Sequence, residues 1–290
     1  MDFPIHPLLP KDFPPLLREI PDAPTHLSIR GTLPGPEYIY LCIVGSRRTT
    51  QYGSRTLSQL IAGLARYPVA IVSGLAWGTD ANAHKIALEV GLPTVAVMPS
   101  GLNDDVMYPT MNRPLAKQIL KSGGALISEN PANFKAMLHS FAQRNRIAAG
   151  MSKTALIVEA GEKSGTLITA RLALDYNREV LVVTHELGHA TGLGCNTLIH
   201  EGATLVRNSD DVLEALGFTT PSTGSGQATL PMDLTDAERS ILEALELEGA
   251  MIRDELIEMA ELTAQEASIA LSSLQIRGLI NERLGKIERI

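Results

Sequence analysis

The stretch HELGHATGLGC, residues 185–195, combines residue types and spacing that could bind a metal ion. In zinc proteases an H-E-x-x-H motif on a helix places two histidine ligands one turn apart, with a glutamate beside the water that attacks the substrate. Here those residues would be His185, His189 and Glu186, with Cys195 as a third ligand. The sequence around the motif decides whether such a site can form.

That surrounding sequence argues against a zinc helix. The preceding run REVLVVT is rich in β-branched residues and is typical of a strand, and three glycines follow within seven residues. Each glycine in a helix interior costs about 1 kcal/mol. We therefore predict that residues 185–193 form a loop, that the chain is not a metalloprotease, and that it binds no metal. The alternative is adventitious metal binding by His185, His189 and Cys195.

Three glycine-containing loops follow predicted strands and could bind phosphate. They comprise Gly45, Ser46 and Arg47 in the first loop, Ser73 and Gly74 in the second, and Ser164, Gly165 and Thr166 in the third. Glycine lets a phosphate approach the backbone, N–H groups at a helix N-terminus attract anions, and arginine adds a bidentate contact. No loop matches the Walker or the G-x-G-x-x-G pattern. We expect a phosphate-bearing ligand, but neither ordinary nucleotide hydrolysis nor dinucleotide redox chemistry.

A fourth feature is the helical stretch FAQRNRIAAGMS, which contains Phe141, Arg144, Asn145 and Arg146. Phe141 and Arg144 are three residues apart and can share one helix face. An aromatic ring beside arginines can stack a nucleobase and hold a backbone phosphate. The alternative is a core phenylalanine next to solvated arginines. Arg47, Lys163 and the glycine loops, predicted at the same edge, favour binding.

These residues must be positioned by alternating strands and helices. Short apolar runs predict strands at residues 38–45, 69–74, 94–98, 124–129, 154–160, 179–184 and 203–206. Helical spacing predicts helices at residues 54–67, 81–90, 138–150 and 166–177. Continuously apolar strands separated by helices indicate a doubly wound α/β fold with a mostly parallel sheet, buried on both faces. In such sheets ligands bind at the carboxyl ends of the strands.

Composition divides the chain into four parts. Residues 1–36 are rich in proline and predict an irregular arm, and residues 37–218 contain the α/β pattern. Residues 219–232 are rich in Ser, Thr, Gly and Pro, which predicts a flexible linker. Residues 233–290 form a second, smaller domain.

The second domain predicts a winged helix-turn-helix. It contains three helical stretches, two of which begin with capping boxes, Thr235 with Glu238 and Thr263 with Glu266. The ending LINERLGKIERI predicts a β-hairpin that turns at Leu284-Gly285. Three helices followed by a hairpin are typical of that motif.

The charge is distributed unevenly along the chain. The net charge is −7, and residues 233–290 alone contain 13 acidic and 6 basic residues. Residues 113–180 instead contain 10 basic and 5 acidic residues, so a local basic patch is compatible with an acidic protein. The best recognition helix of the second domain offers only Arg277 as a base. We therefore expect that domain to contact protein or to regulate the first domain, because it would neutralise phosphates poorly.

The remaining bulk properties indicate a cytoplasmic protein. The chain has 290 residues, and no apolar run approaches the roughly 18 residues that span a membrane. Its N-terminus lacks a basic segment followed by an apolar stretch, so we expect no signal peptide. Two cysteines, Cys42 and Cys195, provide no disulfide framework, which suits a reducing compartment.

Several motifs follow one another between residues 12 and 215. They read FPPLLREIPDAPTHLSIRG, IVGSRRTTQYG, IVSGLAWGTDANAH, SENP, FAQRNRIAAGMS, VEAGEKSGTLITARLALDYNREV and GCNTLIHEGA. In type and order they resemble the DNA-processing protein A family, also called DprA or Smf. The chain departs from that family's pattern after EVLVVT, where HELGHATGL stands in place of Pro-Gly.

The resemblance implies a binding protein rather than an enzyme. It implies an extended Rossmann-like domain that binds single-stranded DNA, forms a homodimer, and helps to load the RecA recombinase onto incoming DNA during natural transformation. By the matching motifs, the DNA pocket would contain Arg47, Ser73 and Gly74, the Arg144-Asn145-Arg146 cluster, and Ser164-Gly165-Thr166, with Lys163 at its rim.

Two alternatives stay open. The same glycine loops could serve a nucleotide-binding or nucleotide-cleaving enzyme, in which Glu159 is the only well-placed carboxylate, at a strand end. A zinc metalloprotease through His185, Glu186 and His189 is the more remote one. Neither a cofactor nor a membrane partner is expected.

Overall fold

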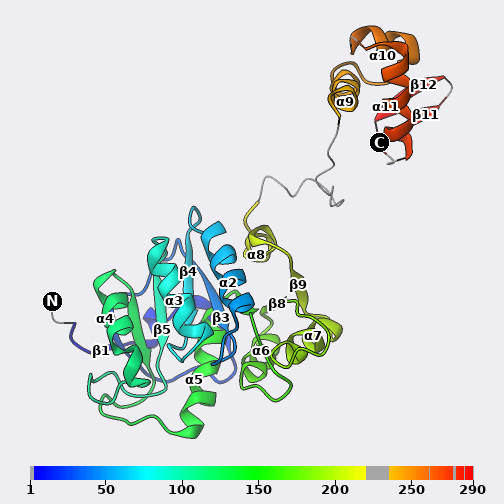
Figure 1. The fold of residues 1–290 in the computed structure, drawn as a ribbon. Coiled ribbons are helices and arrows are strands. Elements are labelled where there is room, and N and C mark those ends of the chain that lie inside the picture. The colour runs from blue at the N-terminus through cyan, green and yellow to red at the C-terminus, as the bar shows by residue number, and fades with distance from the viewer. Residues whose placement is uncertain (1–2, 220–234, 261, 277–278, 284, 290) are drawn as a thin grey trace. The chain divides into compact units, whose positions relative to one another are not determined.

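The computed structural model describes residues 3–219, 235–260, 262–276, 279–283 and 285–289. Contacts divide the chain into two compact units, Met1–Gly224 and Ser225–Ile290 (Figure 1). Of the predicted linker at residues 219–232, only Thr219 lies within the described residues.

The first unit is built on a nine-stranded sheet in the order β1-β2-β6-β5-β4-β3-β7-β8-β9. All seven predicted strands form, as β3 (Ile39–Val44), β4 (Val69–Ser73), β5 (Thr94–Val97), β6 (Ala125–Ser128), β7 (Thr154–Ile157), β8 (Glu179–Val183) and β9 (Thr204–Val206). These seven strands are mutually parallel. The chain builds outward from β3 in both directions, so the strand order reverses between β3 and β7. The connections that follow these two strands diverge and leave a crevice at their carboxyl ends.

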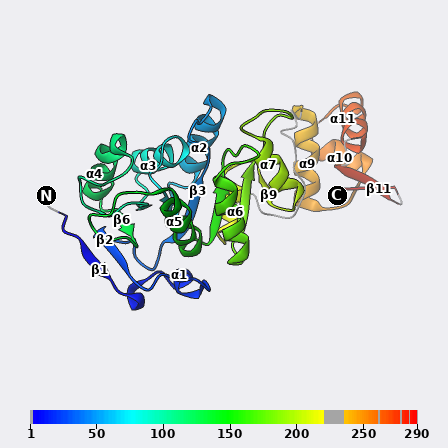
Figure 2. The same cartoon turned by 90° about the horizontal axis from the view of Figure 1, so that it is seen from below.

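Helices cover both faces of this sheet. They are α1 (Pro15–Glu19), α2 (Gln51–Gly63), α3 (Thr79–Glu89), α4 (Arg113–Lys121), α5 (Leu138–Met151), α6 (Thr166–Asp175), α7 (Leu193–His200) and α8 (Ser209–Ala215). Figure 2 shows α2, α3 and α4 along one side of the sheet and α1 and α5 along the other. The four predicted helices correspond to α2, α3, α5 and α6. Among the described residues, no helix is long and apolar enough to cross a membrane.

The continuous apolar runs are explained by burial on both faces. In β3, Leu41 and Ile43 pack in the core cluster that includes α2, α3 and α8 residues. Cys42 and Val44 pack in the cluster that includes residues of α1, α5, α6 and α7. Because successive strand residues point to opposite faces, a doubly covered strand needs apolar residues at every position.

The prediction of an irregular N-terminal arm is wrong. Residues 1–36 contribute β1 (His6–Leu8) and β2 (Leu27–Gly31), and β2 pairs antiparallel with β6. Leu27 and Ile29 alternate with polar residues and are buried, which is the period of a strand with one covered face. Because the surrounding residues are rich in proline, this short alternation of apolar and polar residues was not recognised as a strand.

The second unit has the predicted order of three helices and a hairpin. Its elements are α9 (Asp236–Glu248), β10 (Met251–Ile252), α10 (Arg253–Met259), α11 (Ala264–Ile276), β11 (Ile280–Arg283) and β12 (Lys286–Arg289). Both capping boxes form: the Thr235 and Thr263 side chains accept from the Glu238 and Glu266 backbone N–H groups. Gly285 turns the hairpin with a φ of 76°. Arg277 and Leu284 lie outside the described residues.

Candidate functional site

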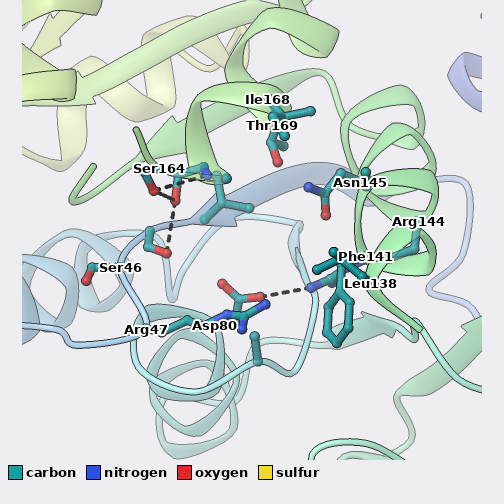
Figure 3. Close-up of a pocket in the computed structure, with 16 residues that line it drawn as sticks. Ser46, Arg47, Asp80, Leu138, Phe141, Arg144, Asn145, Ser164, Ile168 and Thr169 are labelled. Carbon is teal, nitrogen blue, oxygen red and sulfur yellow. Dashed lines mark hydrogen bonds and ion pairs between the residues drawn. The ribbon is translucent and has the colours of Figure 1, made fainter. Parts of the chain in front are cut away.

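A pocket of about 430 Å³ opens at the point where the strand order reverses. Its walls come from the loop after β3, the loop between β4 and α3, one face of α5, and the start of α6. It is lined by Val44, Gly45, Ser46, Arg47, Ala76, Asp80, Leu138, Phe141, Ala142, Arg144, Asn145, Ser164, Gly165, Thr166, Ile168 and Thr169. Figure 3 shows the side chains of α5 on one side of this space and those of α6 above it.

The loop after β3 forms one wall and is tightly packed from below. A Cβ added to Gly45 would lie 2.5 Å from the Thr79 hydroxyl oxygen, so only glycine fits there. The Ser46 carbonyl accepts a hydrogen bond from the Thr79 backbone N–H at 3.1 Å, which joins the loop to the start of α3. The loop therefore presents the Arg47 side chain from a fixed backbone.

Arg47 is the exposed cation of the pocket. Its guanidinium carbon lies 5.1 Å from the centroid of the Phe141 ring, which is a cation–π distance. Within the described part of the chain, no carboxylate lies within ion-pair distance of this guanidinium. A ligand anion therefore has no carboxylate to displace at this position.

The opposite wall is the first turn of α6. The Ser164 hydroxyl donates to the Thr166 hydroxyl at 3.0 Å and accepts from the Thr166 backbone N–H at 3.2 Å. The space above Gly165 is open for at least 4 Å from the position of a Cβ. Apart from the neighbouring Ser164 and Thr166, nothing blocks the approach of an anion to Gly165 at the positive end of the α6 dipole.

Arg144 forms the floor of the pocket and is already paired. Its guanidinium donates to the Asp80 carboxylate at 3.4 Å and to the Val97 carbonyl at 3.0 Å, and both charged side chains are 8% exposed. Burial raises the pKa of the Asp80 carboxyl, and the charge of Arg144 opposes that shift. The sequence motif predicts that Arg144 binds phosphate directly. In the structure its guanidinium instead binds Asp80 and the carbonyl at the end of β5.

Four predicted site residues do not line the pocket: Ser73, Gly74, Arg146 and Lys163. The Ser73 hydroxyl donates to the Ile43 carbonyl at 2.6 Å, and a Cβ on Gly74 would overlap the Arg144 guanidinium. Both residues therefore support the floor from beneath. Arg146 donates to the Glu129 carboxylate at 2.6 Å, because it lies five residues after Phe141, on another face of α5. Lys163 is exposed outside the lining.

Sequence reasoning also missed several lining residues, including Asp80, Leu138, Ile168 and Thr169. Leu138 lies three residues before Phe141 on the same helix, so helical spacing could have identified it. Ile168 and Thr169 belong to the first turn of α6, which the glycine loop introduces. Asp80 could not be identified as a lining residue from its neighbours in the sequence, because its partner Arg144 is 64 residues away.

The histidine motif lies in the predicted loop, between β8 and α7. Gly188 has a φ of 79°, which is left-handed and breaks any helix there. His185 donates from Nε2 to the Val158 carbonyl at 2.8 Å, and the His185 and His189 ring centroids lie 6.3 Å apart. The geometry of a zinc protease therefore does not form. Among the described residues there is no group of three or more His, Cys, Asp or Glu residues that could hold a metal ion.

Glu159 is buried and engaged in hydrogen bonds away from the pocket. Its carboxylate accepts from the Thr50 hydroxyl at 2.6 Å and from the Thr50 backbone N–H at 3.1 Å. Thr50 is the N-cap of α2 and accepts in turn from the Gly53 backbone N–H. Glu159 thus anchors the start of α2, and it does not face the space in which a nucleotide could be cleaved.

Comparison with known protein families gives two matches. Residues 6–217 match the family described as DNA recombination-mediator protein A, and residues 225–286 match the DprA winged helix domain. Protein Smf of Escherichia coli is 40% identical over 221 residues, which cover 75% of this chain and 59% of the relative. The chain thus spans about three fifths of the length of that relative.

Two solved structures share the fold. DNA processing protein A from Streptococcus pneumoniae is 36% identical, with a TM-score of 0.69 over 75% of this chain and 76% of that chain. DNA processing protein A from Helicobacter pylori, for which a single-stranded DNA binding mode is described, is 30% identical, with a TM-score of 0.64 over 74% of this chain and 96% of that chain. The family matches agree with the motifs, the sheet order and the second unit: this chain belongs to the DNA recombination-mediator protein A family and carries its winged helix domain.

Proposed function

We propose that this chain binds single-stranded DNA in the pocket between α5 and α6. The observation that supports this best is the pair formed by Arg47 and Phe141, which places an unpaired cation and an aromatic ring side by side at the pocket mouth. A nucleotide carries the two complementary groups, an anionic phosphate and a base with a π-face.

The walls of the pocket divide into a part suited to phosphate and a part suited to a base. Arg47, the hydroxyl of Ser164 and the first turn of α6 can hold the phosphate. Phe141 and Leu138, both on α5, offer the apolar surface. A ring can stack on a base face only when the base is unpaired or splayed out, so this arrangement favours a single strand over a duplex.

The wider role follows from the family. We propose that the chain protects incoming DNA and helps to load the RecA recombinase in natural transformation, acting as a homodimer in the cytoplasm. Family membership supports this role, as does the single-stranded DNA binding described for the Helicobacter pylori relative. The acidic winged helix domain is proposed to contact protein or to regulate the first unit.

We also propose that the chain acts by binding and not by catalysis. Glu159, the carboxylate that a cleavage reaction would need, is buried against Thr50. Asp80, which does line the pocket, is paired with Arg144. A nucleotide screen that showed turnover would support the alternative of a nucleotide-cleaving enzyme.

The direct test is fluorescence anisotropy with a labelled thymidine oligonucleotide, and with a duplex of the same length, over a range of salt concentrations. We expect Arg47→Ala to weaken single-strand binding about tenfold, and to reduce the salt dependence because one phosphate contact is lost. Arg48→Ala is the matched control, since Arg48 is also exposed but does not line the pocket. Equal affinities of wild type and Arg47→Ala would rule out this pocket.

The assembly and the partner need separate measurements. Light scattering of the full chain should give twice the monomer mass, and a pull-down with RecA should retain the chain only if it binds that recombinase. A monomer at micromolar concentration would contradict the homodimer without touching the DNA-binding proposal.

A further inference from the structure

Two large aromatic side chains beside the pocket are exposed although neither lines it. Trp77 is 49% exposed and Tyr108 is 40% exposed. Trp77 lies in the connection between β4 and α3, and Tyr108 lies shortly before α4. Large aromatic surface in contact with water is unfavourable, so rings held open beside a binding pocket point to a ligand that covers them.

Tyr108 continues a row of contacts that starts inside the pocket. Its ring centroid lies 5.6 Å from that of Phe141, with the planes at 82°. Phe141 in turn lies under the Arg47 guanidinium. The three side chains form a continuous row of contacts that leads from the pocket to Tyr108.

Trp77 lies at the mouth of the same pocket because the residues before it in the chain are fixed there. Ala76 lines the pocket. The Asn112 side-chain amide donates to the Leu75 carbonyl at 2.8 Å and to the Ala76 carbonyl at 3.3 Å. Asn112 therefore joins the Trp77 connection to the turn that follows Tyr108, so the two rings belong to adjoining segments.

We propose that Trp77 and Tyr108 are base-stacking subsites for the nucleotides next to the one held in the pocket. This inference rests on the proposed function and extends it from a site for one nucleotide to a site for a short strand. Stacking uses the π-face common to all bases, so these subsites add affinity without sequence preference. Nucleobases are the favoured occupant because the Tyr108 ring contacts Phe141, which lines the pocket, and because Trp77 follows the lining residue Ala76.

The chain provides its own reporter for this proposal, since Trp77 is its single tryptophan. Thymidine oligonucleotides should quench the intrinsic fluorescence of the wild type, because a stacked base contacts the indole directly. An oligonucleotide of the same length with abasic residues next to one central thymidine keeps the phosphates but offers no base to the subsites. It should bind more weakly and leave the fluorescence unchanged.

Substitutions give the second measurement, by anisotropy of a labelled oligonucleotide. Trp77→Ala and Tyr108→Ala should each weaken binding of the thymidine oligonucleotide about tenfold, and should change binding of the abasic oligonucleotide less than about twofold. Trp77→Phe and Tyr108→Phe should retain most of the affinity because they keep a ring. Tyr52→Ala is the control for the loss of an exposed ring elsewhere, since Tyr52 is 48% exposed and does not line the pocket.

The outcomes separate this proposal from the function on which it rests. Binding detected by anisotropy without quenching, together with wild-type affinity in both alanine variants, would overturn the stacking subsites and leave single-stranded DNA binding intact. That result would assign the two rings to a protein partner instead. No anisotropy change with any oligonucleotide would overturn the proposed function and this extension together.

Discussion

The pocket between α5 and α6 and the loop at residues 184–192 lie at the same carboxyl edge of the sheet. Both contain residue types that bind ligands in other proteins. In the pocket, parts of the chain from several elements converge, so Arg47, Phe141 and the first turn of α6 face one space. In the loop, His185 and His189 come from one irregular segment, and His185 already donates to the Val158 carbonyl.

The difference lies in what surrounds each motif. The H-E-x-x-H motif binds zinc only on a helix, and this loop is not helical because Gly188 is left-handed. A phosphate pocket needs helix N-termini and side chains from different elements. The reversal of strand order brings these groups together. A buried layer of polar groups, which includes Arg144, Asp80 and His84, then supports the pocket.

The largest effect is expected from removing the ion pair under the pocket. Arg144→Ala leaves Asp80 buried without its partner, which should lower the free energy of unfolding by about 3 kcal/mol. Urea denaturation of the variant measures this. The double variant Asp80→Asn with Arg144→Met should recover part of the loss, because no unpaired buried charge remains. A loss below about 1 kcal/mol in the single variant would contradict the structural role of the Arg144–Asp80 pair.

His84 predicts a stability that depends on pH. Its Nδ1–H donates to the Thr94 hydroxyl at 2.6 Å, while Nε2 is buried without a partner among the described residues. Burial, and to a lesser degree Arg144, lower the pKa of His84 to about 3 from the ordinary 6.5. Below pH 6.5 the unfolded chain takes up a proton that the folded chain refuses. His84 should therefore destabilise the fold by about 2 kcal/mol at pH 5 relative to pH 7.

The measurement is urea denaturation at both pH values, with His84→Gln as the comparison. Glutamine does not titrate, so the variant should lose that part of the pH dependence even if it is less stable overall. An identical difference between pH 7 and pH 5 in both proteins would contradict the buried neutral imidazole.

Glu159 tests the region between the pocket and the loop. Glu159→Gln removes the charge that accepts from the Thr50 hydroxyl and N–H, and should cost about 2 kcal/mol of unfolding free energy. Thermal and urea denaturation check the stability, and anisotropy checks DNA binding. We expect affinity to change much less than in Arg47→Ala. Loss of a nucleotide-cleaving activity with unchanged stability would instead favour the enzyme alternative.

The smallest effects are expected in the histidine loop. His185→Ala removes the hydrogen bond to the Val158 carbonyl and should cost about 1 kcal/mol. His189 is exposed, so His189→Ala should stay within about 0.5 kcal/mol of the wild type. Equilibrium dialysis against zinc should give far less than one ion per chain. Stoichiometric zinc that both substitutions abolish would revive the metal site.

Particular residues show how far the sequence alone could lead. The runs that form β3 to β8 are identifiable because a doubly covered strand is largely apolar, and Thr235 with Glu238 is identifiable because a capping box spans four residues. In the site, Arg47 and Phe141 were named from their types, and the pocket contains both. Ser73 and Arg146 are also predicted from their residue types, yet Ser73 supports the pocket from beneath and Arg146 pairs with Glu129 outside its lining.

Sequence by itself determined what depends on neighbours a few residues apart: strand and helix periods, caps, and the glycines that follow β3 and β4. Only the tertiary structure decided which strand edges adjoin, because pairing such as that of β2 with β6 joins segments far apart in the chain. That order decided that Arg144 meets Asp80 across 64 residues and is buried, while Arg47 stays open beside Phe141. A side chain's type sets the chemistry it can do, and its burial and partners decide whether that chemistry is free for a ligand.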